Sequence, residues 1–142
     1  MKKLTYLIFA LISVHFLQAQ KLDASKVPSQ VKSGFSNKYP GIQKINWEKE
    51  NGLYEASFKE NGQNYSATFK PDGTFTESEI DIKINQLPAP VLGYMKEHYG
   101  GTEIKEASKI TTSNGEINYE AAIQGKDVIF DANGKFIKEV KD

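Results

Sequence analysis

The side chains that most often carry out catalysis are scarce in this chain of 142 residues. It has no Cys, which excludes a thiolate nucleophile, disulfides and lipid attachment through a cysteine. His98 has no His or Cys at metal-ligand spacing, and no Ser lies in a Gly-x-Ser-x-Gly turn. The sequence therefore predicts a protein that is not an enzyme and that holds no metal or cofactor.

Two short motifs resemble ligand or modification sites. "DANG" at 131–134 resembles part of a calcium loop, but Asn133 directly precedes Gly134 and Val140 stands where an EF-hand loop needs Glu. A hairpin turn explains this motif better. "NYS" at 64–66 matches the N-glycosylation triplet but falls on an expected strand. We assign a site to neither motif.

Residues 1–20 have the features of a secretory signal peptide. Lys2 and Lys3 precede an apolar stretch from Leu4 to Leu17, and the small residue Ala19 follows it. Such a stretch is too short to span a bilayer of roughly 30 Å. We therefore expect a periplasmic or secreted protein with no stable membrane insertion after cleavage.

The remaining segment, residues 21–142, has the size of one domain. Without Lys2 and Lys3, 16 Lys stand against 18 acidic residues, and the chain contains no Arg. Nucleic-acid binding normally needs a basic excess and Arg side chains. Nucleic acid is therefore not an expected partner.

Two segments predict short helices. "VPSQVKSGFSNKYPG" at 27–41 matches "LPAPVLGYMKEHYGG" at 87–101, with apolar residues four positions apart. Each begins at a Pro that suits a first helical turn and ends at a Pro-Gly or Gly-Gly pair. After each helix, apolar residues alternate with polar ones between Asn-Gly or Asp-Gly pairs, which predicts antiparallel hairpins.

Together these patterns predict an α+β fold, a tandem repeat of a helix followed by a four-stranded antiparallel meander. The two repeats span residues 26–84 and 86–142 within a single domain. The connector "TESEIDIKINQLP" at 76–88 predicts a long bent strand with a bulge near Glu77 to Glu79, because Phe75 is out of phase with the Ile residues that follow. Trp47, Tyr54, Tyr65 and Tyr119 fall on the core face.

The helix starts, the Tyr-Pro-Gly and Tyr-Gly-Gly helix ends, the hairpin turns and this connector resemble the PepSY-like family, which is described as β-lactamase-inhibitor-like. The resemblance covers the chain from about Lys26 to its end. It implies a fold like that of the β-lactamase inhibitor protein. The resemblance implies no catalytic residue.

The sheet face opposite the core carries the candidate binding surface. Ser57, Thr68 and Thr76 lie on this face in the first repeat, and apolar residues take their place in the second: Ala122, Ile129 and Ile137. Packing against a loop or terminus explains this as well as a partner site does. The expected polar rim comprises Asn118, Glu120, Gln124, Asp127, Asp131 and Lys135.

These observations favour a non-enzymatic protein-binding module that acts on another envelope or secreted protein. The resemblance also implies an inhibitor or regulator of a secreted hydrolase, a peptidase or a lactamase. The alternative is a carrier of a small apolar ligand held between the helices and the sheet.

Overall fold

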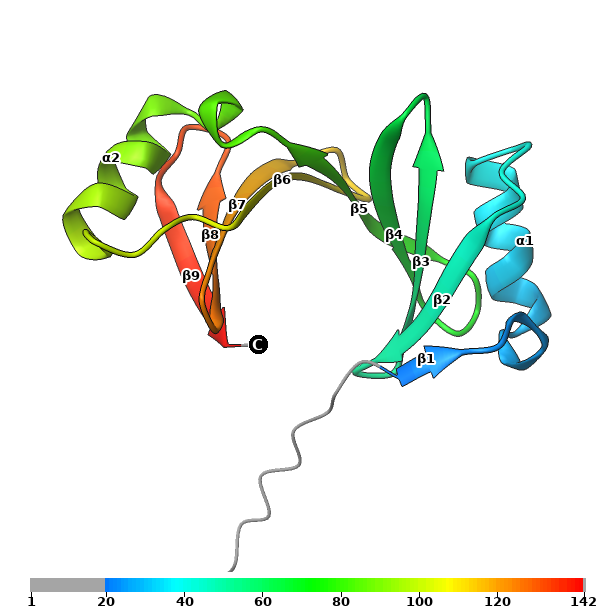
Figure 1. The fold of residues 1–142 in the computed structure, drawn as a ribbon. Helices are drawn as coiled ribbons and strands as arrows, with labels where there is room; N and C mark the ends of the chain where they lie inside the picture. Colours follow the sequence, from blue (N-terminus) through cyan, green and yellow to red (C-terminus); the bar gives the residue numbers. More distant parts are fainter. Residues whose placement is uncertain (1–19, 142) are drawn as a thin grey trace, which may run out of the picture.

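Figure 1 shows the computed structural model, which describes residues 20–141. The expected signal peptide lies outside the described residues except for Gln20. The helices are α1 (Ser29–Lys38) and α2 (Ala89–His98), with short 3-10 helices at Ala24–Lys26 and Ile84–Gln86. The strands are β1 (Gln20–Leu22), β2 (Ile45–Glu50), β3 (Leu53–Glu60), β4 (Gln63–Phe69), β5 (Phe75–Ile82), β6 (Glu106–Thr112), β7 (Ile117–Ile123), β8 (Lys126–Asp131) and β9 (Phe136–Lys141).

The described strands form one antiparallel sheet of nine strands, in the order β1 to β9. The prediction of an α+β tandem repeat of two helix-and-meander units is therefore wrong, because the protein is mainly β and its sheet is continuous. β5 pairs with β6 over six residue pairs, from Glu77 opposite Thr112 to Ile82 opposite Ala107. The sheet also contains β1, which pairs with β2 and was not predicted.

Both helices begin and end at residues whose chemistry explains the boundary. Pro28 and Pro88 directly precede the first helical residues. Proline has no backbone N–H, and at this position the helix has no hydrogen bond that would need one. At the other end, the Tyr39 N–H donates to the Phe35 carbonyl at 2.8 Å, and the Tyr99 N–H donates to the Met95 carbonyl at 2.9 Å. These positions agree with the two helices predicted from the sequence.

Each helix covers its own hydrophobic core. Phe35 of α1 lies at the centre of the N-terminal core, with ring centroids 5.6 Å from Trp47, 5.1 Å from Phe58 and 6.1 Å from Phe69. In the C-terminal core, Met95 and Val91 of α2 pack among residues of β6, β7 and β8. The two cores share no buried residue, so among the described residues the sheet is what connects them.

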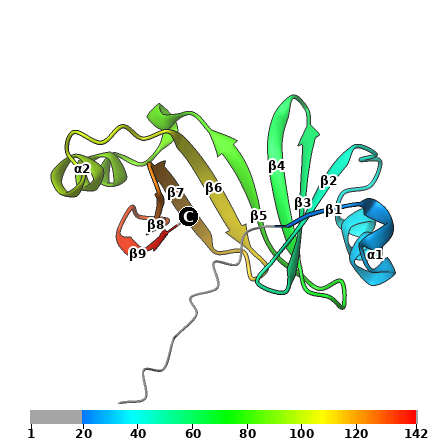
Figure 2. The same cartoon turned by 60° about the horizontal axis from the view of Figure 1, so that its bottom comes forward.

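The helices lie on the outer side of the sheet, at opposite ends, and the sheet curves between them like an arch (Figures 1 and 2). Residues on the inner side of the arch face away from both helices. We call this inner sheet surface the open face.

A β-bulge bends the sheet beside each core. Between β4 and β5 the register changes from Thr68 opposite Glu77 to Phe69 opposite Phe75, so Thr76 is the extra residue. The Thr76 hydroxyl donates to the Thr68 carbonyl at 3.0 Å. The bulge thus lies one residue before the predicted range. An equivalent shift occurs between β8 and β9, where Ile137 is the extra residue.

The close approach of α1 to the β4–β5 turn gives a stability prediction. A Cβ atom on Gly34 would lie 2.2 Å from the backbone oxygen of Gly73, whereas a Cβ on Gly93 of α2 would meet nothing within 4 Å. We expect Gly34→Ala to lower the free energy of unfolding by about 1–3 kcal/mol through this overlap. Gly93→Ala should leave it unchanged or raise it by up to about 1 kcal/mol through helix propensity. Chemical denaturation measures both, and equal effects would contradict the packing.

The β5–β6 ladder predicts a single cooperative unfolding transition for residues 20–141. Each half has about 60 residues, which is marginal for independent stability. Because the two cores share one sheet, opening either half also exposes the β5–β6 strand edge of the other. Scanning calorimetry should give equal calorimetric and van't Hoff enthalpies. Two resolved transitions would show instead that the cores unfold separately.

Candidate protein-binding face

Directly paired residues place a row of side chains across the open face. Asn46 lies opposite Ser57, Ser57 opposite Ser66, and Ser66 opposite Glu79. The row continues from Glu79 to Ile110 on β6. Since residues opposite each other on neighbouring strands share a face, these side chains all point to the inner side of the arch.

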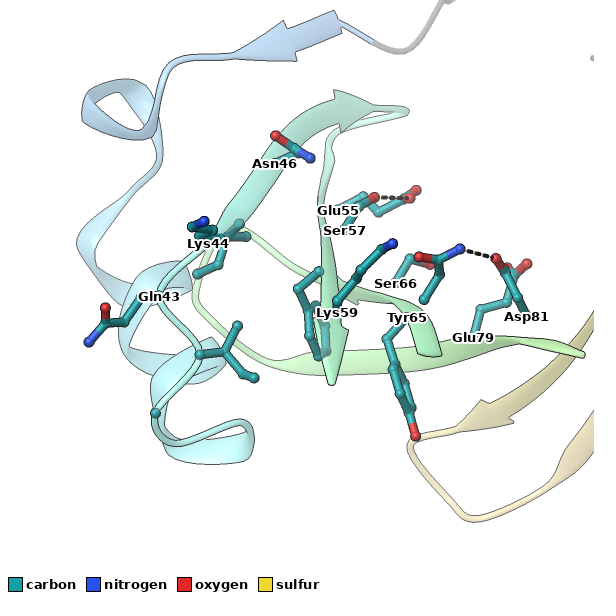
Figure 3. A pocket seen from close by; sticks show the side chains of 15 residues that line it. Gln43, Lys44, Asn46, Glu55, Ser57, Lys59, Tyr65, Ser66, Glu79 and Asp81 are labelled. Carbon is teal, nitrogen blue, oxygen red and sulfur yellow. Dashed lines mark hydrogen bonds between the residues drawn. The ribbon is translucent and has the colours of Figure 1, made fainter. Parts of the chain in front are cut away.

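A groove of about 1100 Å³ lies on the N-terminal half of the open face. Figure 3 shows that its side chains come from strands β2 to β5 and from the segment 41–44 that precedes β2. Asn64 is one of the lining residues, and its amide donates to the Asp81 carboxylate at 2.7 Å. The residues that line the groove, which we call the N-terminal groove, are Gly41, Ile42, Gln43, Lys44, Ile45, Asn46, Glu55, Ser57, Phe58, Lys59, Asn64, Tyr65, Ser66, Glu79 and Asp81.

Glu55 and Glu79 lie in the N-terminal groove, in an environment that disfavours their ionised forms. Burial raises the pKa of Glu55, and the neighbouring charges of Glu79, Glu48 and Glu50 raise it further. Burial also raises the pKa of Glu79, against the lowering effect of a hydrogen bond with Ser108. Within residues 20–141, neither carboxylate forms an ion pair.

The C-terminal half of the open face is more apolar. Ile110 and Ile129 lie on this face, yet each is only 8% exposed. Ser108 beside them is 4% exposed. A smaller groove of about 680 Å³ lies next to this apolar centre, between the β6 start and the β7–β8 turn, and Glu120, Ala122 and Gln124 are among its residues.

The structure brings together some of the residues that the sequence assigned to a partner site. Ala122 and Glu120 line the smaller groove, and Ile129 lies opposite Glu120 on the neighbouring strand. Ile129 itself offers little surface to a partner, whereas Ile137 at the bulge is 47% exposed. The assignment of this patch to a partner stays a prediction.

The polar rim of that patch is spread more widely than expected. Asn118 lies between Ile110 and Asp131 on the open face. Lys135 instead follows the β8–β9 turn, where its N–H donates to the Asp131 carboxylate at 2.9 Å. Asn133 donates to the same carboxylate oxygen at 2.9 Å, so "DANG" forms a hairpin turn.

Sequence reasoning missed the N-terminal groove, because it assigned the candidate binding surface to the apolar residues that replace Ser57, Thr68 and Thr76 in the second repeat. A signal was present: Glu55, Glu77, Glu79 and Asp81 occupy alternating positions on the non-core face. Alternation of this kind also describes an ordinary solvated strand. The curvature that half-buries Glu55 and Glu79 could not be inferred from it.

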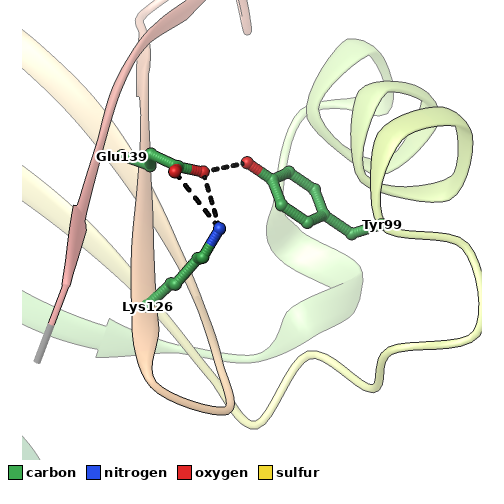
Figure 4. Close-up of polar contacts among 3 residues, drawn as sticks. All are labelled: Tyr99, Lys126 and Glu139. Carbon is green, nitrogen blue, oxygen red and sulfur yellow. Dashed lines mark hydrogen bonds and ion pairs between the residues drawn. The ribbon is translucent and has the colours of Figure 1, made fainter.

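A polar cluster near the end of α2 holds that helix to the sheet (Figure 4). The Tyr99 hydroxyl donates to the Glu139 carboxylate at 2.7 Å, and the Lys126 ammonium donates to both oxygens of that carboxylate at 3.2 Å. The hydrogen bond to Glu139 raises the pKa of Tyr99 to about 12. We assign this cluster a structural role.

His98 lies beside this cluster. Its ring stacks on Tyr94 with a centroid distance of 4.0 Å, and its Nε2 lies 3.9 Å from the Glu97 carboxylate. Across residues 20–141, no group of three or more His, Cys, Asp or Glu is arranged to hold a metal ion. No helix in the same range is long and apolar enough to cross a membrane.

Comparison with known protein families identifies the chain. The sequence profile of the family described as "Putative beta-lactamase-inhibitor-like, PepSY-like" matches residues 15–75 and 51–138. The chain belongs to this PepSY-like family. Its resemblance to the family, seen in the sequence, is thereby confirmed. No match was found among the curated proteins compared.

Solved structures from Bacteroides share the fold. A periplasmic protein of Bacteroides eggerthii aligns with a TM-score of 0.69 at 16% identity, covering 81% of this chain and 88% of that one. A DUF2874 family protein of Bacteroides uniformis aligns at 0.65 and 16% identity, covering 80% and 88%. A BLIP-like protein of Bacteroides fragilis aligns at 0.58 and 24% identity, covering 80% and 86%. At these low identities the structural alignments show the fold alone, which is a BLIP-like fold.

The raised pKa of Glu79 predicts a pH-dependent stability change on substitution. A folded-state pKa above the ordinary value of 4.5 means that this group stabilises the fold most below pH 4.5, and that this contribution is lost as the pH rises through the folded pKa. Glu79→Gln removes the charge, so it should raise the melting temperature at pH 7.5. Near pH 4 the variant and the parent protein should melt at similar temperatures.

The matched control is Glu97→Gln, because the Glu97 side chain lies on α2 and is 79% exposed. It should leave the melting temperature nearly unchanged at both pH values. Equal stabilisation by the two variants at pH 7.5, or destabilisation by Glu79→Gln, would show that burial of the Glu79 carboxylate is not costly.

Proposed function

We propose that this PepSY-like protein is an exported, non-enzymatic binding module that recognises another envelope or secreted protein through its open face. The family description supports an inhibitor-like role, and the Bacteroides eggerthii protein of the same fold is described as periplasmic. The partner that this reasoning favours is a secreted hydrolase, a lactamase or a peptidase, whose activity the module restrains.

The observation that carries the proposal is the open face itself. Both described helices pack on the outer side of the sheet, so the inner side is a concave surface that no helix covers (Figure 2). Two grooves lie on it, and the sheet strands that form its floor are fixed by a core on their other side. A preformed concave surface loses little conformational entropy when a partner binds.

The alternative, a carrier of a small apolar ligand between the helices and the sheet, has less support. Phe35 is 1% exposed and Met95 is 4% exposed, so large side chains fill the space beneath each helix. The serines and carboxylates of the N-terminal groove lie on the opposite surface of the sheet. An apolar ligand beneath a helix would have to displace these core side chains.

A matched pair of substitutions tests the proposal. Ser66→Arg places a long side chain on the floor of the N-terminal groove, and Ser36→Arg places the same side chain on the exposed surface of α1. The parent protein and both variants are immobilised, partners are captured from an envelope extract of the source organism, and recovered proteins are identified by mass spectrometry. Surface plasmon resonance then measures the affinity of the purified partner.

We expect Ser66→Arg to weaken binding at least tenfold, which corresponds to about 1.4 kcal/mol, while Ser36→Arg binds like the parent. When the partner is a hydrolase, adding the module should lower its turnover in proportion to occupancy. A partner that is lost with Ser36→Arg and kept with Ser66→Arg would place binding on the helices. Equal binding by all three proteins would remove the open face from the proposal.

A further inference from the structure

We infer that the N-terminal groove receives a Lys or Arg side chain from a loop of the partner protein, and that Glu55 and Glu79 are its anionic contacts. This inference rests on the proposed function and deepens it, because it names the chemistry by which the open face selects a partner.

The two carboxylates approach the groove from strands on either side of β4. Glu55 projects from β3 and Glu79 from β5, and both line the same groove with Ser57 and Ser66 (Figure 3). The Ser57 hydroxyl donates to the Glu55 carboxylate at 3.4 Å. Hydrogen bonds from hydroxyl groups orient the carboxylates but do not neutralise their charge. The groove therefore presents preoriented negative charge to an incoming group.

Nearby lysines do not supply the missing positive charge. Lys44 and Lys59 line the groove, yet within residues 20–141 no ion pair joins either of them to Glu55, Glu79 or Asp81. Both lysines are exposed, where water and salt screen their charge. Three groove carboxylates therefore face two lysines that remain in solvent, and a cation placed at the floor would be better positioned than either.

The size of the groove favours a long side chain over a free metal ion. A volume of about 1100 Å³ exceeds what a single ion fills, and Ser57 and Ser66 lie beside the carboxylates on the same face of the sheet. Lys and Arg bury an apolar stem while their charged end reaches a polar group. An Arg fork can also bind a carboxylate through two parallel hydrogen bonds.

Folding has already placed these carboxylates in a partly desolvated position. Burial and the like charges around Glu55 and Glu79 disfavour their ionised forms in the free protein. A cation from the partner would reverse that unfavourable interaction, and part of the desolvation cost of a buried ion pair is met before binding. Charge complementarity is therefore the interaction that this groove can contribute to recognition.

Loops displayed on phage provide the test. A library of disulfide-closed loops with nine random positions is selected against the parent protein, and enriched loops are sequenced and synthesised. We expect a Lys or Arg to be enriched at one fixed loop position. Changing that residue to Gln should weaken binding at least tenfold.

Substitutions in the protein test the same contact from the side of the groove, by the affinity of the selected loops for each variant. Glu55→Gln and Glu79→Gln should each weaken binding of the basic loops at least tenfold, whereas Glu97→Gln on α2, which removes the same charge, should change it less than twofold. Lys59→Gln should strengthen binding, because it removes a competing cation from the groove. Unchanged melting temperatures, or raised ones for the groove variants, confirm that each protein is folded.

The failure of this inference can be told apart from failure of the proposed function. Loops that lose affinity for Ser66→Arg but carry no basic residue would overturn the inference and leave the open face as the binding surface. Loops that bind Ser66→Arg and the parent protein equally would count against both. A selection that yields no loop, or loops that bind the Glu→Gln variants as well as the parent, would also overturn it.

Discussion

The antiparallel pairing of β5 with β6 is the contact on which the rest of the structure depends. The N-terminal core and the C-terminal core contain different residues, and each is covered by its own helix. Six residue pairs between β5 and β6 join them into one sheet, and a hydrogen bond from the Ser113 N–H to the Thr76 carbonyl at 2.7 Å extends the contact beyond the strands. The bulge at Thr76, one residue before this junction, bends the sheet next to it and adds to the curvature of the open face.

That curvature explains why polar residues on the open face are not ordinary solvated side chains. Glu79 pairs with Ile110 across the β5–β6 junction, so the acidic half of the face meets the apolar half there. Half-burial of Glu55 and Glu79 weakens the folded state at neutral pH, and the aromatic packing around Phe35 on the other side of the sheet offsets it. Residues that reduce stability in this way are typical of functional surfaces.

Local sequence signals predicted the elements well and their assembly poorly. Pro28 and Pro88 marked the helix starts, and the Asn-Gly and Asp-Gly pairs marked hairpins whose glycines, such as Gly52 and Gly73, have positive φ angles. β1 was missed because three residues are too short to show an alternating pattern. The prediction of a tandem repeat of two helix-and-meander units was wrong, because the alternation of residues within a strand does not show which other strand pairs with it. The N-terminal groove was missed for the same reason, since its depth comes from long-range curvature.

The two halves of the open face together restrict the kind of partner that fits. β4 and β8 lie four strands apart in the sheet, which corresponds to about 19 Å at the usual strand spacing. The N-terminal groove presents carboxylates, whereas the smaller groove lies in the C-terminal half beside the buried Ile110 and Ile129, so a single side chain or a small ion cannot contact both. An extended peptide could cross this distance, but it would lose much conformational entropy on ordering. A folded protein that carries a basic side chain on a rigid surface would contact both halves at a lower entropic cost, which supports a globular partner for the proposed binding function.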